Sequence, residues 1–120
     1  VARFNNGNGR DQTRVIVLNE ANNDPVATPE EIAEEGVPNQ DTAGPRIRQV
    51  EKTGGEEEAN KDFDRLKPNN VRERENGVRT GILQDGRGVT VRPSSYSGKP
   101  TLEIMNGDGT RIKIRYGTRP

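Results

Sequence analysis

The stretch PTLEIMNGDGTRIKIRYG, residues 100–117, decides the fold that the sequence predicts. Apolar side chains occupy every second position on both sides of NGDG, and such alternation is typical of strands with one buried and one solvent-exposed face. The Asn, Asp and Gly between the two halves are residues that tight turns use. The stretch therefore predicts an antiparallel hairpin with one buried face.

Three further segments place this hairpin in a larger unit. Residues 78–83 and 88–93 show strand-like alternation, and turn residues separate them from each other and from the hairpin. Residues 56–66 have apolar side chains at helical spacing. These apolar residues are Ala59, Phe63 and Leu66. The expected fold class is α+β, with an N-terminal helix packed on a four-stranded antiparallel sheet and preceded by a loosely structured acidic extension.

The charge of the chain divides along its length. Residues 1–60 hold 6 Lys or Arg and 12 Asp or Glu, a net charge of −6, whereas residues 61–120 hold 13 and 7, a net charge of +6. Such asymmetry predicts a polyanion-binding part and an acidic part. An uneven scatter of ordinary surface charge is the alternative explanation.

The expected domain boundary follows this division. Residues 1–55 are predicted to be the acidic extension and residues 56–120 the C-terminal domain. Within the extension, TPEEIAEEG at 28–36 predicts a short helix, because its Thr can cap the helix and Pro suits the first helical position. Residues 37–55 contain Pro, Gly and Gln without a period, which predicts a linker.

The composition excludes several classes of function. The chain has no Cys and no His, so disulfides, zinc–thiolate sites and a Ser-His-Asp triad are excluded. Any reaction must use carboxylate, amine, guanidinium, hydroxyl or phenol groups. We expect neither a cofactor nor a metal site. We also expect no stable membrane insertion, since no apolar run approaches about 18 residues.

Alternation sorts the strand residues into two faces. The apolar face is predicted to pack on the helix and to contain Val78, Ile82, Val89, Val91, Leu102, Ile104, Ile112, Ile114 and Tyr116. The opposite face is predicted to contain Arg79, Thr90, Arg92, Thr101, Glu103, Arg111, Lys113 and Arg115. Five cations around one carboxylate attract phosphates, because Arg offers a planar fork of donors. Such residues also cover sheets that only need to remain soluble, so both interpretations stay open.

This set of groups suits RNA cleavage through the 2′-hydroxyl. That reaction needs a base for the hydroxyl, cations for the charge that develops on the phosphate, and a proton for the leaving oxygen. Glu103 is the candidate base, because nearby cations keep it ionised. The candidates for stabilising the transition state are Arg92, Lys113 and Arg115. The candidate proton donors are Thr101, Ser95, Tyr116 and a Lys.

The sequence also resembles a known family. The segments DFDRL, NGVRTGILQDGRGVTVRP, SGKPTLEI and IKIRYG are similar to the C-terminal toxin tips of bacterial polymorphic toxins, including contact-dependent growth inhibition (CdiA-type), haemagglutinin-like and Rhs proteins. The resemblance covers about residues 56–117. It implies a small ribonuclease of the barnase/EndoU/colicin/RelE-like fold. Residues 1–55 lie outside it and would be an entry module or a linker.

The resemblance implies function, location and partners. It implies an endoribonuclease toxin that is secreted or displayed as the tip of a larger protein, and that cuts RNA, most often tRNA, in the cytoplasm of a competing bacterial cell. A cognate immunity protein would block its site, and the need for a host elongation factor is left open. The positions that match the family are Arg79, Arg92, Ser95, Thr101, Glu103, Lys113 and Tyr116. We expect the catalytic residues to be Arg92, Glu103, Lys113, Thr101 and Ser95. We expect the RNA-binding residues to be Arg79, Arg111, Arg115 and Tyr116.

Two other classes of function remain as alternatives. The first is a non-catalytic RNA- or protein-binding module of a large bacterial surface protein. A carboxylate among phosphate contacts is of little use to such a binder, and the 3% aromatic content is low for a protein that stacks on single strands. The second is a structural or adhesin fragment, which would show no toxicity.

Overall fold

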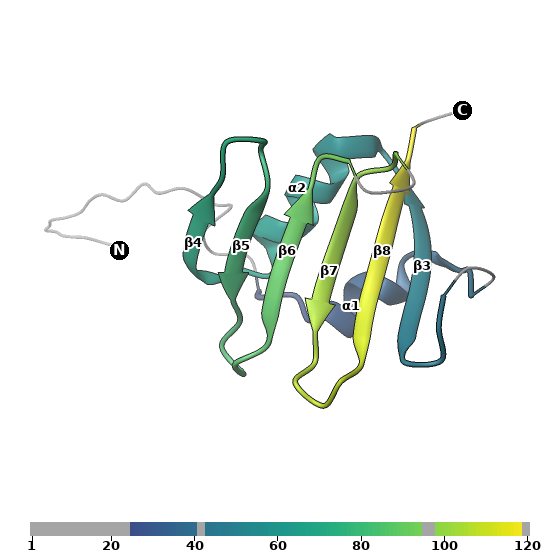
Figure 1. Ribbon diagram of the computed structural model, residues 1–120, viewed down its shortest axis with the longest axis horizontal. Coiled ribbons are helices and arrows are strands. Elements are labelled where there is room, and N and C mark those ends of the chain that lie inside the picture. Colours follow the sequence, from purple (N-terminus) through teal and green to yellow (C-terminus); the bar gives the residue numbers. More distant parts are fainter. Residues whose placement is uncertain (1–24, 41–42, 95–97, 119–120) are drawn as a thin grey trace, which may run out of the picture.

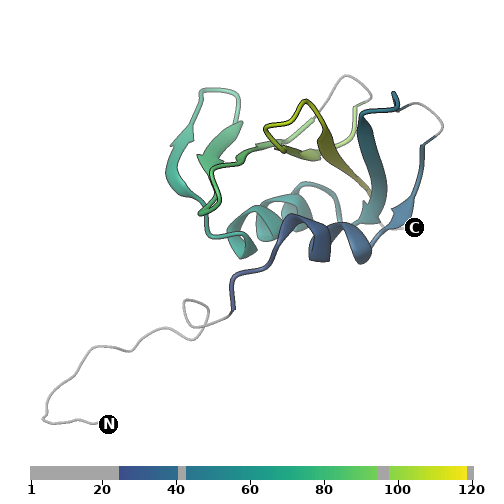
Figure 2. The ribbon, with the colours of Figure 1, turned by 90° about the horizontal axis from the view of Figure 1, so that it is seen from below.

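The computed structural model describes residues 25–40, 43–94 and 98–118. The elements follow one another along the chain as α1 (Pro29–Glu34), β2 (Val37–Pro38), β3 (Ile47–Thr53), α2 (Gly55–Arg65), β4 (Asn69–Glu73), β5 (Arg79–Ile82), β6 (Gly88–Arg92), β7 (Thr101–Met105) and β8 (Arg111–Gly117). Both helices lie on one face of a single sheet, and no helix of the described residues lies on the other face (Figure 2). We call that uncovered side the open face.

The sheet has seven strands in the order β2-β3-β8-β7-β6-β5-β4 (Figure 1). Strands β4 to β8 form an antiparallel meander. Strand β3 pairs in parallel with β8, and β2 pairs with β3 in the antiparallel sense. Helix α2 connects β3 to β4, and so carries the chain from one side of the sheet to the opposite edge. The sheet is therefore mixed.

The predicted fold class was wrong. The fold is α+β, but with seven strands in a mixed sheet and two helices, in place of four antiparallel strands and one N-terminal helix. The meander from β5 to β8 matches the four expected strands. Strand β4 was not predicted. The residues before α2, which we expected to be an extension, form α1, β2 and β3.

The residues of the missed strands explain the error. All five residues of β4 are exposed, so its sequence lacks the alternation that marks a strand with a buried face. Strand β3 turns Val50 toward the helices, but its neighbours on the same side are Arg48 and Lys52. A strand that buries one apolar side chain between two cations gives little periodic signal.

The helix predicted at 28–36 is confirmed. The Thr28 hydroxyl accepts from the backbone N–H of Glu31, and the Glu31 carboxylate accepts from the backbone N–H of Thr28, which makes a capping box. Gly36 follows the helix where the chain passes close to β3. A Cβ at that position would contact Val50 and lie 2.7 Å from the backbone oxygen of Glu51, so only glycine fits there.

The core lies between the helices and the sheet. The expected helical stripe is confirmed, since Ala59, Phe63 and Leu66 are all buried. The strand residues buried with them are Val50, Val89, Val91, Leu102, Ile104, Ile112, Ile114 and Tyr116, and Leu83, directly after β5, is buried as well. Helix α2 contacts β6, β7 and β8, and α1 contacts β8. Within the described part of the chain, the open face therefore carries no helix (Figure 2).

The predicted alternation was wrong for β5. Ile82 is 46% exposed, whereas Leu83 is buried and Arg79 points toward α2. Arg79 and Gly81 are the β5 residues that face the helices, as cross-strand neighbours of Val91 and Val89. Pro68 packs against Gly81, and its Cβ lies 2.7 Å from where a Cβ of Gly81 would be. Pro68 fills the helix side of β5 at the point where a larger side chain would otherwise pack, so this short strand buries little of its own apolar surface.

Among the described residues, no helix is long and apolar enough to cross a membrane.

Candidate functional site

The open face carries a row of side chains that runs across the strands. Strand pairing makes each member the direct neighbour of the next, and neighbouring strands are about 4.8 Å apart. In order from β4 to β3, the row is Arg72, Thr80, Thr90, Glu103, Lys113 and Gln49. A second row beside it consists of Arg92, Thr101, Arg115 and Glu51. The two rows bring together most of the residues predicted to act on RNA.

Glu103 lies at the centre of this face. Its Oε1 accepts a 2.9 Å hydrogen bond from Nη1 of Arg92, and its Oε2 accepts one of 2.8 Å from Nη1 of Arg111. Glu103 itself is 8% exposed, whereas the Arg92 and Arg111 side chains are 42% and 50% exposed. The carboxylate therefore sits below two guanidinium groups that reach the solvent.

The environment of Glu103 keeps it ionised. Burial alone would raise its pKa, but the hydrogen bonds from Arg92 and Arg111, together with their charges, outweigh burial and hold the pKa below its ordinary value. The carboxylate is thus charged at neutral pH. Each of its oxygens keeps a further lone pair beyond the one used by an arginine.

Lys113 and Thr101 are both neighbours of Glu103, Lys113 across the strands on β8 and Thr101 two residues before it on β7. Among the described residues the ammonium group of Lys113 has no ion-pair partner. Thr101 is 1% exposed, and its hydroxyl donates to the backbone oxygen of Lys99 at 3.1 Å. Lys113 is therefore the more available proton donor of the two.

Arg115 belongs to a second charged group on the same face. Its Nη1 lies 3.6 Å from Oε2 of Glu51, and Nζ of Lys99 lies 3.1 Å from Oε1 of the same carboxylate. The Arg115 side chain is 16% exposed, and its buried Nε has no hydrogen-bond partner within the described part of the chain. Sequence reasoning missed Glu51, because it assigned residues 37–55 to a linker.

Arg79 lies on the other side of the sheet. Its guanidinium donates to Asn60 at 2.8 Å and to Asp64 at 2.7 Å, and it lies 4.4 Å from the centre of the Phe63 ring. All three partners belong to α2. The structure therefore does not bring Arg79 together with Glu103, and the geometry indicates a role in holding α2 on the sheet.

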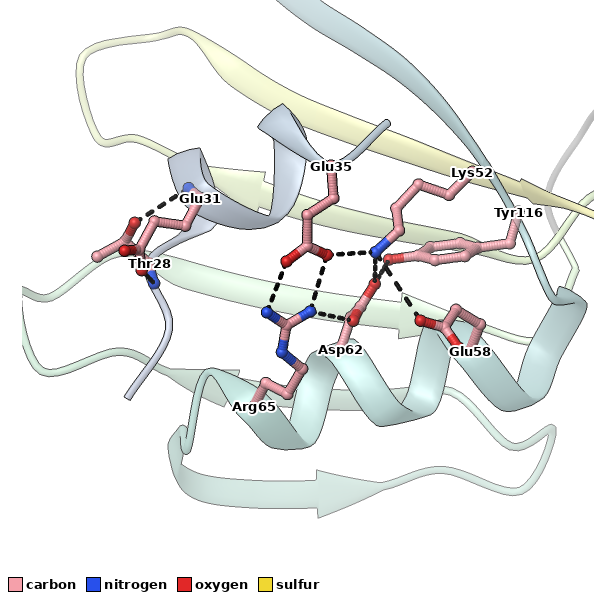
Figure 3. Close-up of polar contacts among 8 residues, drawn as sticks. All are labelled: Thr28, Glu31, Glu35, Lys52, Glu58, Asp62, Arg65 and Tyr116. Atoms are coloured by element: carbon pink, nitrogen blue, oxygen red, sulfur yellow. Dashed lines mark hydrogen bonds and ion pairs between the residues drawn. The ribbon is translucent and has the colours of Figure 1, made fainter. Parts of the chain in front are cut away.

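Tyr116 also points away from the open face. It is fully buried, and its hydroxyl donates a 2.7 Å hydrogen bond to Oδ2 of Asp62, itself fully buried on α2 (Figure 3). Burial and the charge of Asp62 raise the pKa of Tyr116 well above its ordinary value, so the phenol stays protonated. A side chain enclosed in this way cannot reach an RNA on the open face.

The Tyr116–Asp62 pair belongs to a network between the helices and the sheet. Lys52 donates to Asp62 and to Glu35, each at 2.8 Å, and Arg65 bridges the same two carboxylates (Figure 3). Buried charges are tolerated when they are paired and hydrogen-bonded. Asp62 and Tyr116 are fully buried, whereas the Glu35 and Arg65 side chains are 42% and 35% exposed. We call Glu35, Lys52, Asp62, Arg65 and Tyr116 the polar network. It joins α1, α2, β3 and β8.

Ser95, the remaining predicted catalytic residue, lies outside the described residues. Among those that are described, no three Asp or Glu side chains converge as ligands for a metal ion would. Five of the nine predicted site residues thus gather around Glu103 or beside it on the open face. They are Arg92, Thr101, Arg111, Lys113 and Arg115.

Comparison with known proteins gives no further information on this site. No protein-family model matches the chain, no curated protein matches it, and no solved structure matches it.

Proposed function

We propose that this protein is a metal-independent endoribonuclease that binds RNA on the open face and cuts it beside Glu103. One observation carries the proposal: a carboxylate held ionised by Arg92 and Arg111 lies at the centre of a basic sheet face, with Lys113 next to it. The two solvent-reaching guanidinium groups and the ammonium group can bind a phosphate above the carboxylate.

The reaction needs only these groups and the RNA. Glu103 takes the proton of a 2′-hydroxyl, and the resulting oxygen attacks the adjacent phosphorus. The bond to the 5′-oxygen breaks, and Lys113 protonates that leaving oxygen. The products are a 2′,3′-cyclic phosphate and a free 5′-hydroxyl. Arg92 and Arg111 stabilise the charge that builds up on the non-bridging oxygens, and preorganised charge of this kind is usually the largest catalytic contribution.

Support for a toxin role comes from the sequence. The resemblance to polymorphic toxin tips leads us to propose tRNA in a competing bacterial cell as the substrate and an immunity protein as the partner. An inhibitor of this site would present carboxylates to the open face, because the cations there outnumber the two acidic groups, Glu51 and Glu103.

A second candidate function is RNA binding without cleavage. It is favoured by one observation, that both oxygens of Glu103 already accept from arginines. In that case Glu103 would only position Arg92 and Arg111 for phosphate binding. The two candidates predict the same binding surface and differ in whether the RNA is cut.

Cleavage of total bacterial RNA by the purified chain, with EDTA and then with magnesium, distinguishes them. We expect cleavage in EDTA, with cyclic phosphate ends, and its loss in Glu103→Gln without loss of the folded state by circular dichroism. Lys61→Gln, at an exposed position on α2 on the opposite side of the sheet, is the control that should keep full activity. RNA that binds but stays intact would favour the binding module, and cleavage retained by Glu103→Gln would exclude Glu103 as the base.

A further inference from the structure

A groove opens on the open face beside Glu103. It has a volume of about 350 Å³ and runs over β4, β5 and β6 up to Met105 on β7. Its apolar walls include Ile82 and Met105, both 46% exposed. Thr80 and Thr90 also line it and present hydroxyl groups. Thr90 is the direct cross-strand neighbour of Glu103, so the groove begins one strand spacing, about 5 Å, from the backbone of Glu103.

The absence of one side chain shapes this groove. Ile82, Gly88 and Met105 are neighbours in one cross-strand row, and the middle position has no side chain. A Cβ at Gly88 would lie 3.3 Å from Cε of Met105. The flexible Met105 side chain thus reaches over Gly88 into the space that a side chain at this position would take.

The charges around the groove have one sign. Arg72 and Arg74 line it, and the lining includes no carboxylate. Among the described residues neither arginine forms an ion pair or a side-chain hydrogen bond. These groups complement a nucleotide. The apolar walls suit the flat base, the hydroxyl groups suit its polar edges, and the two unpaired guanidinium groups suit the anionic phosphate.

We infer that this groove, which we call the base groove, binds one unpaired base of the RNA next to the phosphate that is cut. The inference rests on the proposed function, because it assigns the substrate's neighbouring nucleotide. The base packs against the apolar side chains of Ile82 and Met105, the hydroxyls of Thr80 and Thr90 contact its polar edge, and Arg72 or Arg74 binds the next phosphate. A base can enter only when it is unstacked, so the substrate is a single-stranded or looped segment.

The geometry also sets the direction of the RNA on the sheet. Arg72 and Glu103 belong to the same row and are three strands apart, a distance of about 14 Å. The chain therefore crosses the strands and does not run along them, with its phosphates following the row and its base pointing toward Gly88.

Binding of short RNAs that cannot be cut tests the inference. The probes are fluorescent 2′-O-methyl tetranucleotides of A, C, G or U, and an abasic tetramer with the same phosphates. We expect at least one of the four to bind about tenfold more tightly than the abasic tetramer, the effect of one well-placed base. Gly88→Val should fill the groove and abolish this preference, while leaving the affinity for the abasic tetramer unchanged.

Two matched variants complete the experiment. Ile82→Ser should reduce the preference, whereas Val37→Ser, a change of an exposed residue in β2 at the other end of the sheet, should not. Equal binding of base-bearing and abasic tetramers by the native chain would overturn the base groove and leave the proposed function standing. A base preference that Gly88→Val leaves intact would also overturn it. A preference lost in Gly88→Val, in a chain that cuts no RNA, would support the groove and contradict the nuclease.

Discussion

Tyr116 on β8 and Asp62 on α2 are 54 residues apart in the chain and share a buried hydrogen bond of 2.7 Å. Lys52 lies 5.9 Å from the centre of the Tyr116 ring and donates to the same carboxylate oxygen. One buried oxygen thus ties together three elements that the sequence separates. The chain has few large apolar residues, so this polar contact contributes stability that a larger apolar core would otherwise provide.

Removing the Tyr116 hydroxyl should destabilise the fold. Tyr116→Phe keeps the ring but leaves Asp62 with one fewer donor, and we expect the free energy of unfolding to fall by about 1.5–3 kcal/mol, the range for hydrogen bonds to charged groups. Urea unfolding followed by circular dichroism measures it. RNA binding at the open face should not change, because Tyr116 lies under the sheet. Unchanged stability would show that water or another group satisfies Asp62.

The contrast between well predicted and badly predicted elements has a physical basis. Strands β6, β7 and β8 and helix α2 alternate or repeat because each buries one complete apolar face, and this pattern can be read locally. Strand β3 buries Lys52 in place of an apolar residue, which is stable only because Asp62 and Glu35 lie opposite it. A sequence does not show which distant carboxylate will compensate a buried cation.

The residues of the candidate site could likewise be predicted only where they follow from a local pattern. Glu103 and its cross-strand neighbours followed from alternation in a single hairpin and the adjacent strand. Arg79 did not, because Arg79 and Gly81 are the β5 residues that face the helices, and Gly81 leaves room there for Pro68 from a non-adjacent segment. Glu51 depended on the parallel pairing of β3 with β8, for which no local pattern exists.

Arg79 and Arg92 should behave differently when each is replaced by Gln. Arg79→Gln removes two hydrogen bonds to α2 and the contact with Phe63, so we expect stability to fall by about 1 kcal/mol and RNA affinity to stay the same. Arg92→Gln should lower RNA affinity and cleavage while costing little stability, since its side chain is 42% exposed. Urea titration and RNA binding on both variants check this. Loss of RNA affinity in folded Arg79→Gln would contradict the placement of Arg79.

The stability of the fold should decrease at low pH, because Glu35 becomes protonated there. The hydrogen bond from Arg65 lowers the pKa of Glu35 to about 2, against 4.5 for an unperturbed Glu, with burial opposing and Lys52 adding to the effect. A depressed pKa stabilises the fold above about pH 4.5, and this contribution is lost as the pH falls toward 2. Glu35→Gln should flatten the pH dependence of the melting temperature in that window. Glu34→Gln, at an exposed neighbour without an ion pair in the described chain, is the control. Equal pH profiles for the native chain and Glu35→Gln would refute this role.

Lys113 should contribute to RNA binding as one phosphate contact. When a cation binds a phosphate of single-stranded RNA, the slope of log K against log salt concentration steepens by about 0.7. Lys113→Gln should therefore reduce that slope by about 0.7 when binding to a 2′-O-methyl RNA is measured at several salt concentrations. Lys61→Gln, at an exposed position on α2 on the opposite side of the sheet, should leave it unchanged. If the Lys61 variant reduced the slope and the Lys113 variant did not, the RNA would bind the helical side, and the open face would lose its assignment.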